Sequence, residues 1–382
     1  MTFIRALSVF LGTVIGVGIF GLPFVALKAG FFVAVVYFVF MALIVVSFHI
    51  IYGEIVLGTE GIHRLPGYVE RYLGRKWKNV VFAIAGVGLA GSLLAYLIVG
   101  GEFLNSLLSS YLGGNSIFYT LLFFSLGSYL IFRGIRSVSW IELSLLVVFF
   151  IILIVFFARS LPFINAEYLA VIDLKFLTFP YGVILFSLWG AAVVPEIKEM
   201  LVKTKNLGKK VNVRSSLRRV IIWGAVLSAF VYLFFIFIVL GVSGFLTSEE
   251  AISGLASTLG GNVIKLGFAF GIISCFTSFI ALGLTLKKIF WYDFGFSKNF
   301  AWFVTCFLPL ILFLLGMRKF IEIIGFVGAV SIGIEGIIIV YLYREFLRQK
   351  LFVKMNPVLY LLVGVFALGI IFEAFYFLFV RA

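Results

Sequence analysis

Four residues near the N-terminus are of types that could interrupt a helix and expose its backbone to a ligand: Gly16, Gly18, Gly21 and Pro23. Proline cannot donate a backbone hydrogen bond and its ring clashes with the preceding helical turn, while glycine need not stay helical. An interrupted helix bares N–H and C=O groups that lipid cannot satisfy, so the interruption must line a polar cavity inside the protein. We therefore predict a helix break within residues 16–23, whose bare main chain is available for ligand binding.

The same glycines also match the G-x-G-x-x-G pattern of dinucleotide-binding proteins. That pattern needs a preceding strand, a βαβ unit and an acidic residue about 20 positions later. Residues 30–50 contain no carboxylate and the motif lies in an apolar run, so we exclude this interpretation. Close packing of helix backbones through Gly12 and Gly16 is the structural alternative to a break. It does not account for the two further glycines and the proline that follow.

A second apolar stretch repeats the pattern of small residues followed by proline. Gly190, Ala191 and Ala192 precede Pro195, and Glu196 comes next, where the N-terminus of a helix favours negative charge. Two interrupted helices at corresponding positions of two halves are the best sequence sign of a transporter binding site. We therefore predict a second break between Ser187 and Pro195.

The two ends of such a break carry opposite partial charges. Beyond the first break, the N–H groups of about Phe20–Leu22 would begin a new helix and attract a carboxylate. Before it, the carbonyls of about Thr13–Gly16 could accept hydrogen bonds from an ammonium group or coordinate a cation. One break therefore matches both charges of an α-amino acid.

Aromatic residues near the breaks would enclose the side chain of such a ligand. No charged residue is predicted inside this pocket, which favours a neutral and large or aromatic amino acid. Packing against lipid or protein is the alternative role for each aromatic residue, since they make up 18% of the chain, and Trp189 is the strongest candidate for the pocket. The predicted substrate-binding residues are Gly16, Val17, Gly18, Ile19, Phe20, Gly21, Tyr96, Phe186, Ser187 and Trp189.

The composition requires a membrane around these segments. Hydrophobic residues make up 63% of the 382 residues and charged residues 12%, against roughly 45–50% and 25% in globular proteins. This composition excludes a soluble or a disordered protein. A helix needs about 20 apolar residues to cross a bilayer. Eleven such runs occur, at about Phe3–Leu27, Phe31–Leu57, Val80–Leu108, Ile117–Phe132, Trp140–Phe157, Thr178–Leu201, Leu217–Val242, Val263–Leu286, Phe300–Leu315, Phe320–Tyr343 and Pro357–Val380.

The distribution of charge predicts the orientation. The net charge of +14 could suggest nucleic acid binding, but the basic residues lie in short loops between apolar runs, so we predict no nucleic acid partner. Most of the 30 Lys and Arg residues lie at the N-terminus and in alternate loops, and residues 198–219 are the most basic of these. By the positive-inside rule, the N-terminus is cytoplasmic and the C-terminus outside, in a multi-pass protein of the cell membrane.

The two predicted breaks lie five spans apart. Spans one to five (about residues 3–157) and spans six to ten (about residues 178–343) would then be inverted repeats, because an odd number of spans in each repeat forces the inversion. Residues 1–343 would form the transporter core, and residues 344–382 an inner loop and an eleventh helix.

At these motifs the sequence resembles the amino acid–polyamine–organocation superfamily. The resemblance is carried by Gly16–Pro23, by Pro195-Glu196-Ile197, and by Tyr96 followed by Gly100-Gly101-Glu102 in the third span. Within the superfamily, the chain is most similar to the amino acid/auxin permeases and the related bacterial aromatic amino acid permeases. The resemblance implies an all-α membrane protein with eleven helices in a LeuT-like 5+5 inverted repeat, in which helices one and six are broken and one helix is extra.

Three hydroxyl residues in span eight suggest the coupling ion. Ser274, Thr277 and Ser278 share one helix face, and hydrogen bonding back to their own helix is the alternative role. The pair Thr277 and Ser278 resembles the Thr-Ser pair with which sodium-coupled relatives close an ion site against span one. The resemblance implies a Na⁺ site formed by Gly12, Ile15, Ser274, Thr277 and Ser278, and oxygen ligands suit a hard cation.

Coupling to protons is the competing prediction. Ionisable groups within a membrane are functional candidates by default. Glu335 in span ten is the deepest carboxylate, and Glu102 lies toward the outer end of span three. The lysine that replaces the ion in proton-coupled relatives is absent from Trp140–Phe157, which favours sodium.

Other classes of function find less support. The only histidines are His49 and His63, and neither belongs to a metal-binding motif such as H-E-x-x-H, so we predict no enzyme activity and no cofactor. We predict a secondary transporter that imports amino acids by alternating access, coupled to Na⁺. A proton-coupled amino acid permease and an amino acid sensor that does not transport remain the alternatives.

Overall fold

The computed structural model describes residues 2–61, 63–134, 139–208 and 211–380, and their regular secondary structure is helical. The helices that cross the bundle or lie at its ends are α1 (Thr2–Val14), α2 (Gly18–Ala29), α3 (Phe31–Gly58), α4 (Leu65–Leu73), α5 (Arg75–Leu112), α6 (Ser116–Arg133), α7 (Ser139–Ser160), α8 (Glu167–Ala170), α9 (Pro180–Leu188), α10 (Val194–Asn206), α11 (Val213–Ser243), α12 (Ala256–Leu259), α13 (Gly261–Lys288), α14 (Lys298–Leu314), α15 (Phe320–Phe326), α16 (Gly333–Phe346) and α17 (Tyr360–Phe375).

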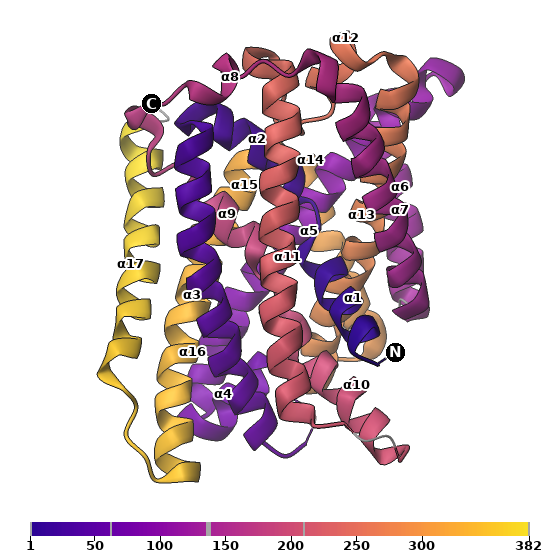
Figure 1. The fold of residues 1–382 in the computed structure, drawn as a ribbon. Helices are drawn as coiled ribbons and strands as arrows, with labels where there is room; N and C mark the ends of the chain where they lie inside the picture. The colour runs from indigo at the N-terminus through magenta and orange to yellow at the C-terminus, as the bar shows by residue number, and fades with distance from the viewer. Residues whose placement is uncertain (1, 62, 135–138, 209–210, 381–382) are drawn as a thin grey trace.

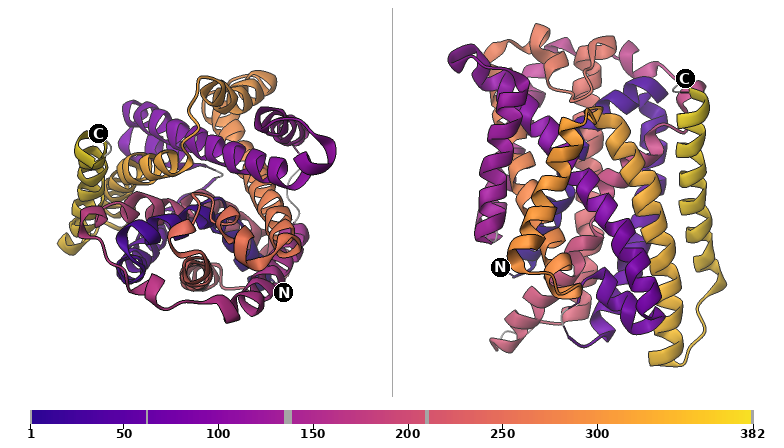
Figure 2. Two further views of the ribbon diagram at one scale, coloured as in Figure 1. Left: turned by 90° about the horizontal axis from the view of Figure 1, so that it is seen from above. Right: turned by 180° about the vertical axis from the view of Figure 1, so that it is seen from behind.

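The long helices run side by side, and the short helices α4, α8, α10 and α12 lie at the two ends of the bundle (Figure 1). Helix α1 begins toward the end that carries α4 and α10, whereas α17 ends near α8. An odd number of crossings places the two ends of a chain on opposite sides in this way. Helix α17 lies at the periphery in every view, where it packs against α16 (Figure 2).

The apolar helices make this a multi-pass membrane protein. Among the described residues, nine helical stretches are long and apolar enough to cross a membrane, with α9–α10 and α15–α16 each counted as one stretch. The bent pair α1–α2, counted as one span, gives a tenth. Helix α14 is also apolar but has only 17 residues, and it corresponds to the ninth predicted span. The count of eleven spans and the inverted repeat remain predictions.

A break is present near the predicted position, but it covers residues 15–17: it begins one residue before the predicted range of 16–23 and ends well before Pro23. Helix α1 ends at Val14, α2 begins at Gly18, and the two are bent by 54°. Pro23 lies inside α2 and does not end a helix. Its ring disturbs the turn that begins four residues earlier, at Ile19, and that turn is the first of α2, directly beside the break.

The second break separates α9 from α10. Trp189 follows α9 in an extended conformation, with φ −76° and ψ 119°, and Gly190 is also non-helical. The 3₁₀ turn Ala191–Val193 leads into α10, whose first turn contains Pro195. Proline is favoured there because the first turn of a helix has no acceptor for its N–H.

The helices form two packed groups. The broken helices α1–α2 and α9–α10 pack against each other and against α3 and α11. Helices α5, α6, α13 and α14 pack together beside them. The two breaks therefore meet in the middle of the first group, next to α5 and α13 of the second.

Candidate substrate site at the two helix breaks

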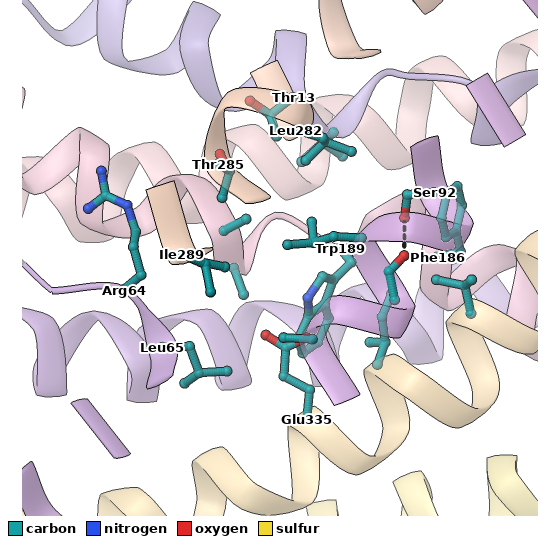
Figure 3. Close-up of a pocket in the computed structure, with 18 of the residues that line it drawn as sticks. Thr13, Arg64, Leu65, Ser92, Phe186, Trp189, Leu282, Thr285, Ile289 and Glu335 are labelled. Carbon is teal, nitrogen blue, oxygen red and sulfur yellow. Dashed lines mark hydrogen bonds between the residues drawn. The ribbon is translucent and has the colours of Figure 1, made fainter. Parts of the chain in front are cut away.

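A cavity of about 100 Å³ lies where the two breaks meet. Five of the predicted substrate-binding residues line it: Gly18, Tyr96, Phe186, Ser187 and Trp189. Glu335, a candidate for proton coupling, also lines the cavity, as does Thr13 at the end of the first half-helix. Three further polar residues that the sequence did not point to, Arg64, Ser92 and Thr285, surround the same space as Phe186 and Trp189 (Figure 3).

Glycine is required at both ends of the first break because other groups occupy the space. A Cβ atom at Gly16 would overlap with the hydroxyl of Tyr96, and one at Gly18 would overlap with Oγ of Ser187. The Cα atom of Ser187 would lie only 3.0 Å from the Cβ at Gly18. The first break therefore packs closely against Tyr96 of α5 and Ser187 of α9.

Tyr232 of α11 links the carbonyl ends of the two breaks. Its hydroxyl lies 2.6 Å from the carbonyl oxygen of Val14 and 2.9 Å from that of Ser187, and it donates toward both. Tyr232 is fully buried. The Val14 carbonyl also accepts from the N–H of Gly16 at 2.8 Å, so both of its lone pairs have donors. It is therefore not one of the free acceptors that were predicted for residues 13–16.

The main-chain groups left for a ligand are fewer than predicted. The N–H of Gly16 donates to Val14, and the N–H groups of Ile19 and Phe20 donate back to Gly16 and Val17. None of the hydrogen bonds found among the described residues uses the carbonyl of Thr13 or the N–H of Gly18. Both residues line the cavity, and they offer one acceptor and one donor at its edge.

Phe20 does not line the cavity, and neither do Gly16, Val17, Ile19 and Gly21. Phe20 follows Gly18 by two residues on a helix, so the two point in very different directions. Its ring instead packs against Phe103 (4.9 Å between ring centroids) and lies near Phe235 and Phe270. Phe20 is fully buried in this cluster, in the first turn of α2 and outside the cavity.

Toward the opposite end, the cavity extends to Arg64, just before α4. Arg64 forms ion pairs with Glu196 (3.2 Å) and Glu199 (2.9 Å) of α10, and Lys288 of α13 pairs with Glu196 (3.1 Å). Burial alone would lower the pKa of the Arg64 guanidinium, but the carboxylates of Glu196 and Glu199 raise it above its ordinary value. These pairs join the loop before α4 to both helix groups at the mouth of the cavity.

The two candidates for proton coupling lie in different places. Glu335, at the start of α16, lines the cavity together with Trp189. Glu102 lies in the last third of α5, is exposed, and does not line the cavity. Only Glu335 is therefore placed to respond to a ligand at the breaks.

The five residues of the predicted Na⁺ site converge beside the first break. Gly12, Ile15, Ser274 and Thr277 line a second, smaller cavity of about 50 Å³, and Ser278 Oγ donates to the Gly12 carbonyl at 3.4 Å. Thr277 also donates back to the carbonyls of Ile273 and Ser274 in its own helix. Among the described residues, no cluster of three or more His, Cys, Asp or Glu side chains could hold a metal. The groups that converge at this smaller cavity are hydroxyl and carbonyl oxygens, which suit a hard cation.

The fold is that of LeuT-type membrane transporters. A structure of MhsT in complex with L-phenylalanine has 17% sequence identity and a TM-score of 0.65, with 98% of this chain and 97% of that chain covered. The Eremococcus coleocola manganese transporter, bound to an aromatic bis-isothiourea compound, has 10% identity and a TM-score of 0.70 (100% and 88% covered). Mhp1, a nucleobase-cation-symport-1 family transporter with bromovinylhydantoin bound, has 13% identity and a TM-score of 0.66 (97% and 90% covered).

The chain belongs to the Tryptophan/tyrosine permease family, whose profile matches residues 1–375. A comparison with curated protein sequences found no match. The family and the fold together make the protein a transporter of aromatic amino acids or similar substrates, and not an enzyme. The resemblance to aromatic amino acid permeases stated from the sequence is confirmed.

Proposed function

We propose that the protein imports a neutral, aromatic amino acid across the cell membrane by alternating access around the two helix breaks. The observation that carries the proposal is the direct contact of Gly18 with Ser187, which brings both breaks to one cavity with aromatic walls. MhsT, the structural neighbour described above, holds L-phenylalanine.

The substrate would be held through both of its charges. Its carboxylate would accept from the N–H of Gly18, where the N-terminus of α2 carries a partial positive charge. Its ammonium group would donate to the carbonyl of Thr13. Its ring would pack against Phe186 and Trp189, with Tyr96 on the side of α5.

The direction of the cavity supports an inward-facing state. It extends toward Arg64 at the end of the bundle rich in basic residues, while the Phe20 cluster would close the other end. With the N-terminus in the cytoplasm and the C-terminus outside, as the basic loops predict, this mouth faces the cytoplasm. Opening to the outside would require Phe20 and Phe103 to separate.

Coupling to Na⁺ is the proposed source of energy, through the oxygens of Gly12, Ile15, Ser274, Thr277 and Ser278. One positive charge that moves down 100 mV supplies about 2.3 kcal/mol, and a tenfold ion gradient about 1.4 kcal/mol. The position of Glu335 in the substrate cavity favours proton coupling as the second candidate. A sensor of the same fold would share the substrate site but not transport.

The test is thermal stabilisation of the purified protein by a panel of amino acids, in sodium and in potassium and at two pH values. We expect tryptophan, tyrosine or phenylalanine to stabilise the protein most, and only in sodium. Stabilisation that is equal in both salts and at both pH values would contradict ion coupling. Uptake of the stabilising amino acid into proteoliposomes, driven by a Na⁺ gradient, separates a transporter from a sensor.

A further inference from the structure

The second break contains a buried backbone N–H that its own chain segment cannot satisfy. Gly190 is buried between α9 and the 3₁₀ turn that follows. A Cβ at this glycine would lie 2.9 Å from Cγ2 of Val14 and 3.0 Å from Cζ of Phe10, so the break packs directly against α1. A buried N–H without an acceptor is costly, particularly within a membrane.

His49 of α3 supplies the missing acceptor. The N–H of Gly190 donates to Nε2 of His49 at 3.2 Å, across 141 positions of sequence. His49 is fully buried. Because the donor is a backbone N–H, Nε2 must be unprotonated, and the single proton of the neutral imidazole lies on Nδ1.

The imidazole also contacts the other residue of the break. Its centroid lies 5.4 Å from that of Trp189, and 5.9 Å and 6.2 Å from those of Phe10 and Phe48. Trp189 lines the substrate cavity, whereas His49 does not. One side chain from α3 thus holds both residues at which the second helix is interrupted.

The histidine does this at a cost to its own hydrogen bonding. Nδ1 of His49 is buried and has no hydrogen-bond partner among the described residues. An apolar residue would avoid this unsatisfied donor, so packing alone does not account for a histidine here. The bond to Gly190 is the feature of the site that an apolar residue cannot provide.

We propose that His49 is a positioning residue: by accepting the N–H of Gly190 and packing against Trp189, it fixes the second break in the geometry that binds the substrate. The expected effect of His49 on substrate affinity rests on the proposed function. Its expected effect on the geometry of the break does not. The N–H of Gly190 then donates to His49 of α3 and is unavailable to the substrate carboxylate.

Three substitutions separate the acceptor from the ring. His49→Gln places an amide oxygen near the position of Nε2 and keeps an acceptor for Gly190. His49→Asn carries the same group on a shorter side chain, which ends near the position of Nδ1. His49→Phe keeps an aromatic ring beside Trp189 and removes the acceptor.

The first measurement is hydrogen–deuterium exchange of residues 186–194 in the full-length protein without substrate. We expect the wild type and His49→Gln to protect this segment, and His49→Asn and His49→Phe to exchange at least tenfold faster. If His49→Phe does not fold, the comparison of His49→Gln with His49→Asn tests the role of the acceptor. Equal protection in those two variants, or no protection in the wild type, would overturn the proposal.

The second measurement is the dissociation constant for the aromatic amino acid that binds the wild type. We expect a value within about threefold of the wild type for His49→Gln and a loss of about tenfold or more for His49→Phe, because the orphan N–H displaces the break. Unchanged affinity in His49→Phe would overturn the substrate-positioning role. If the wild type binds no amino acid, the proposed function fails, while the exchange experiment still decides the role of His49 at the break.

Discussion

Gly18 and Ser187 belong to different interrupted helices and touch at their breaks. A Cβ at Gly18 would overlap with Ser187 Oγ and lie 3.0 Å from Ser187 Cα. Ser187 Oγ is itself held by a hydrogen bond of 2.7 Å to the Val183 carbonyl, so it is not free to rotate away without loss of that bond. The contact ties the start of α2 to the end of α9 beside the proposed substrate cavity.

Substitution Gly18→Ala should therefore separate the two breaks. We expect substrate affinity to fall at least tenfold, since overpacking at such a contact costs about 1–3 kcal/mol. Titration calorimetry with the aromatic amino acid checks this. Gly86→Ala on α5 is the control, because nothing lies within 4 Å of its Cβ position, and it should bind as the wild type does. Wild-type affinity in Gly18→Ala would place the ligand elsewhere.

Removal of the Tyr232 hydroxyl should loosen both breaks at once. Tyr232→Phe leaves the carbonyls of Val14 and Ser187 without their shared donor in a fully buried site. We expect a loss of about 1–3 kcal/mol in stability and a lower melting temperature, together with weaker substrate binding.

Tyr181→Phe provides the comparison for this variant. The Tyr181 hydroxyl donates to a single carbonyl, that of Val365, which joins α9 to α17 and not to the other break. The substitution Tyr181→Phe should reduce the melting temperature but leave substrate affinity unchanged. An equal loss of affinity in both variants would show that Tyr232 has no special role at the breaks.

The helix breaks could be predicted from sequence because their causes are local. Gly16, Gly18 and Gly190 interrupt the helices within a few residues, and the proline-first turn of α10 has a sequence pattern of its own. Pro23 contributes less to the break than its residue type predicts, since a proline in the first turns of a helix disturbs few hydrogen bonds. The position of Phe20 beside the break in sequence predicts a pocket residue, but the helical rotation after Gly18 turns its ring toward Phe103.

The side chains that satisfy the breaks could not be found in this way. Tyr232 lies 218 positions from Val14, and His49 lies 141 positions from Gly190. Tyr232 and His49 bond to backbone atoms, which every residue provides. The identity of the residue at the break therefore does not indicate which distant side chain will bond to it. Arg64 likewise acquires its role only when α4 is brought next to Glu196 of α10.

Loss of the Ser278 hydroxyl should weaken the response to sodium. In Ser278→Ala, the Gly12 carbonyl loses its partner on α13 and the proposed ion site loses one oxygen. We expect the Na⁺ concentration needed for half-maximal stabilisation to rise about tenfold or more, measured by thermal shift with substrate present. Ser47→Ala is the matched control, because this exposed hydroxyl only bonds back to Leu43 in its own helix. An unchanged response to Na⁺ in Ser278→Ala would contradict this site.

Neutralisation of Glu335 should distinguish the two coupling ions. Glutamine keeps the size of the side chain but cannot carry the charge, so Glu335→Gln should retain Na⁺-driven uptake into proteoliposomes if sodium is the coupling ion. Glu102→Gln, outside the cavity, is the comparison. Uptake that follows a proton gradient in the wild type and loses this dependence only in Glu335→Gln would instead support the proton-coupled alternative.

The central claim is that bare main chain at the breaks binds both charges of the substrate, and analogues that lack one charge test it most directly. Dissociation constants of the purified protein should be compared for tryptophan, tryptamine without the carboxylate, and indole-3-propionate without the ammonium group. Each missing charge removes a charge-assisted hydrogen bond of about 1.5–3 kcal/mol, so both analogues should bind at least tenfold more weakly. Binding of either analogue as tight as that of tryptophan would contradict the account.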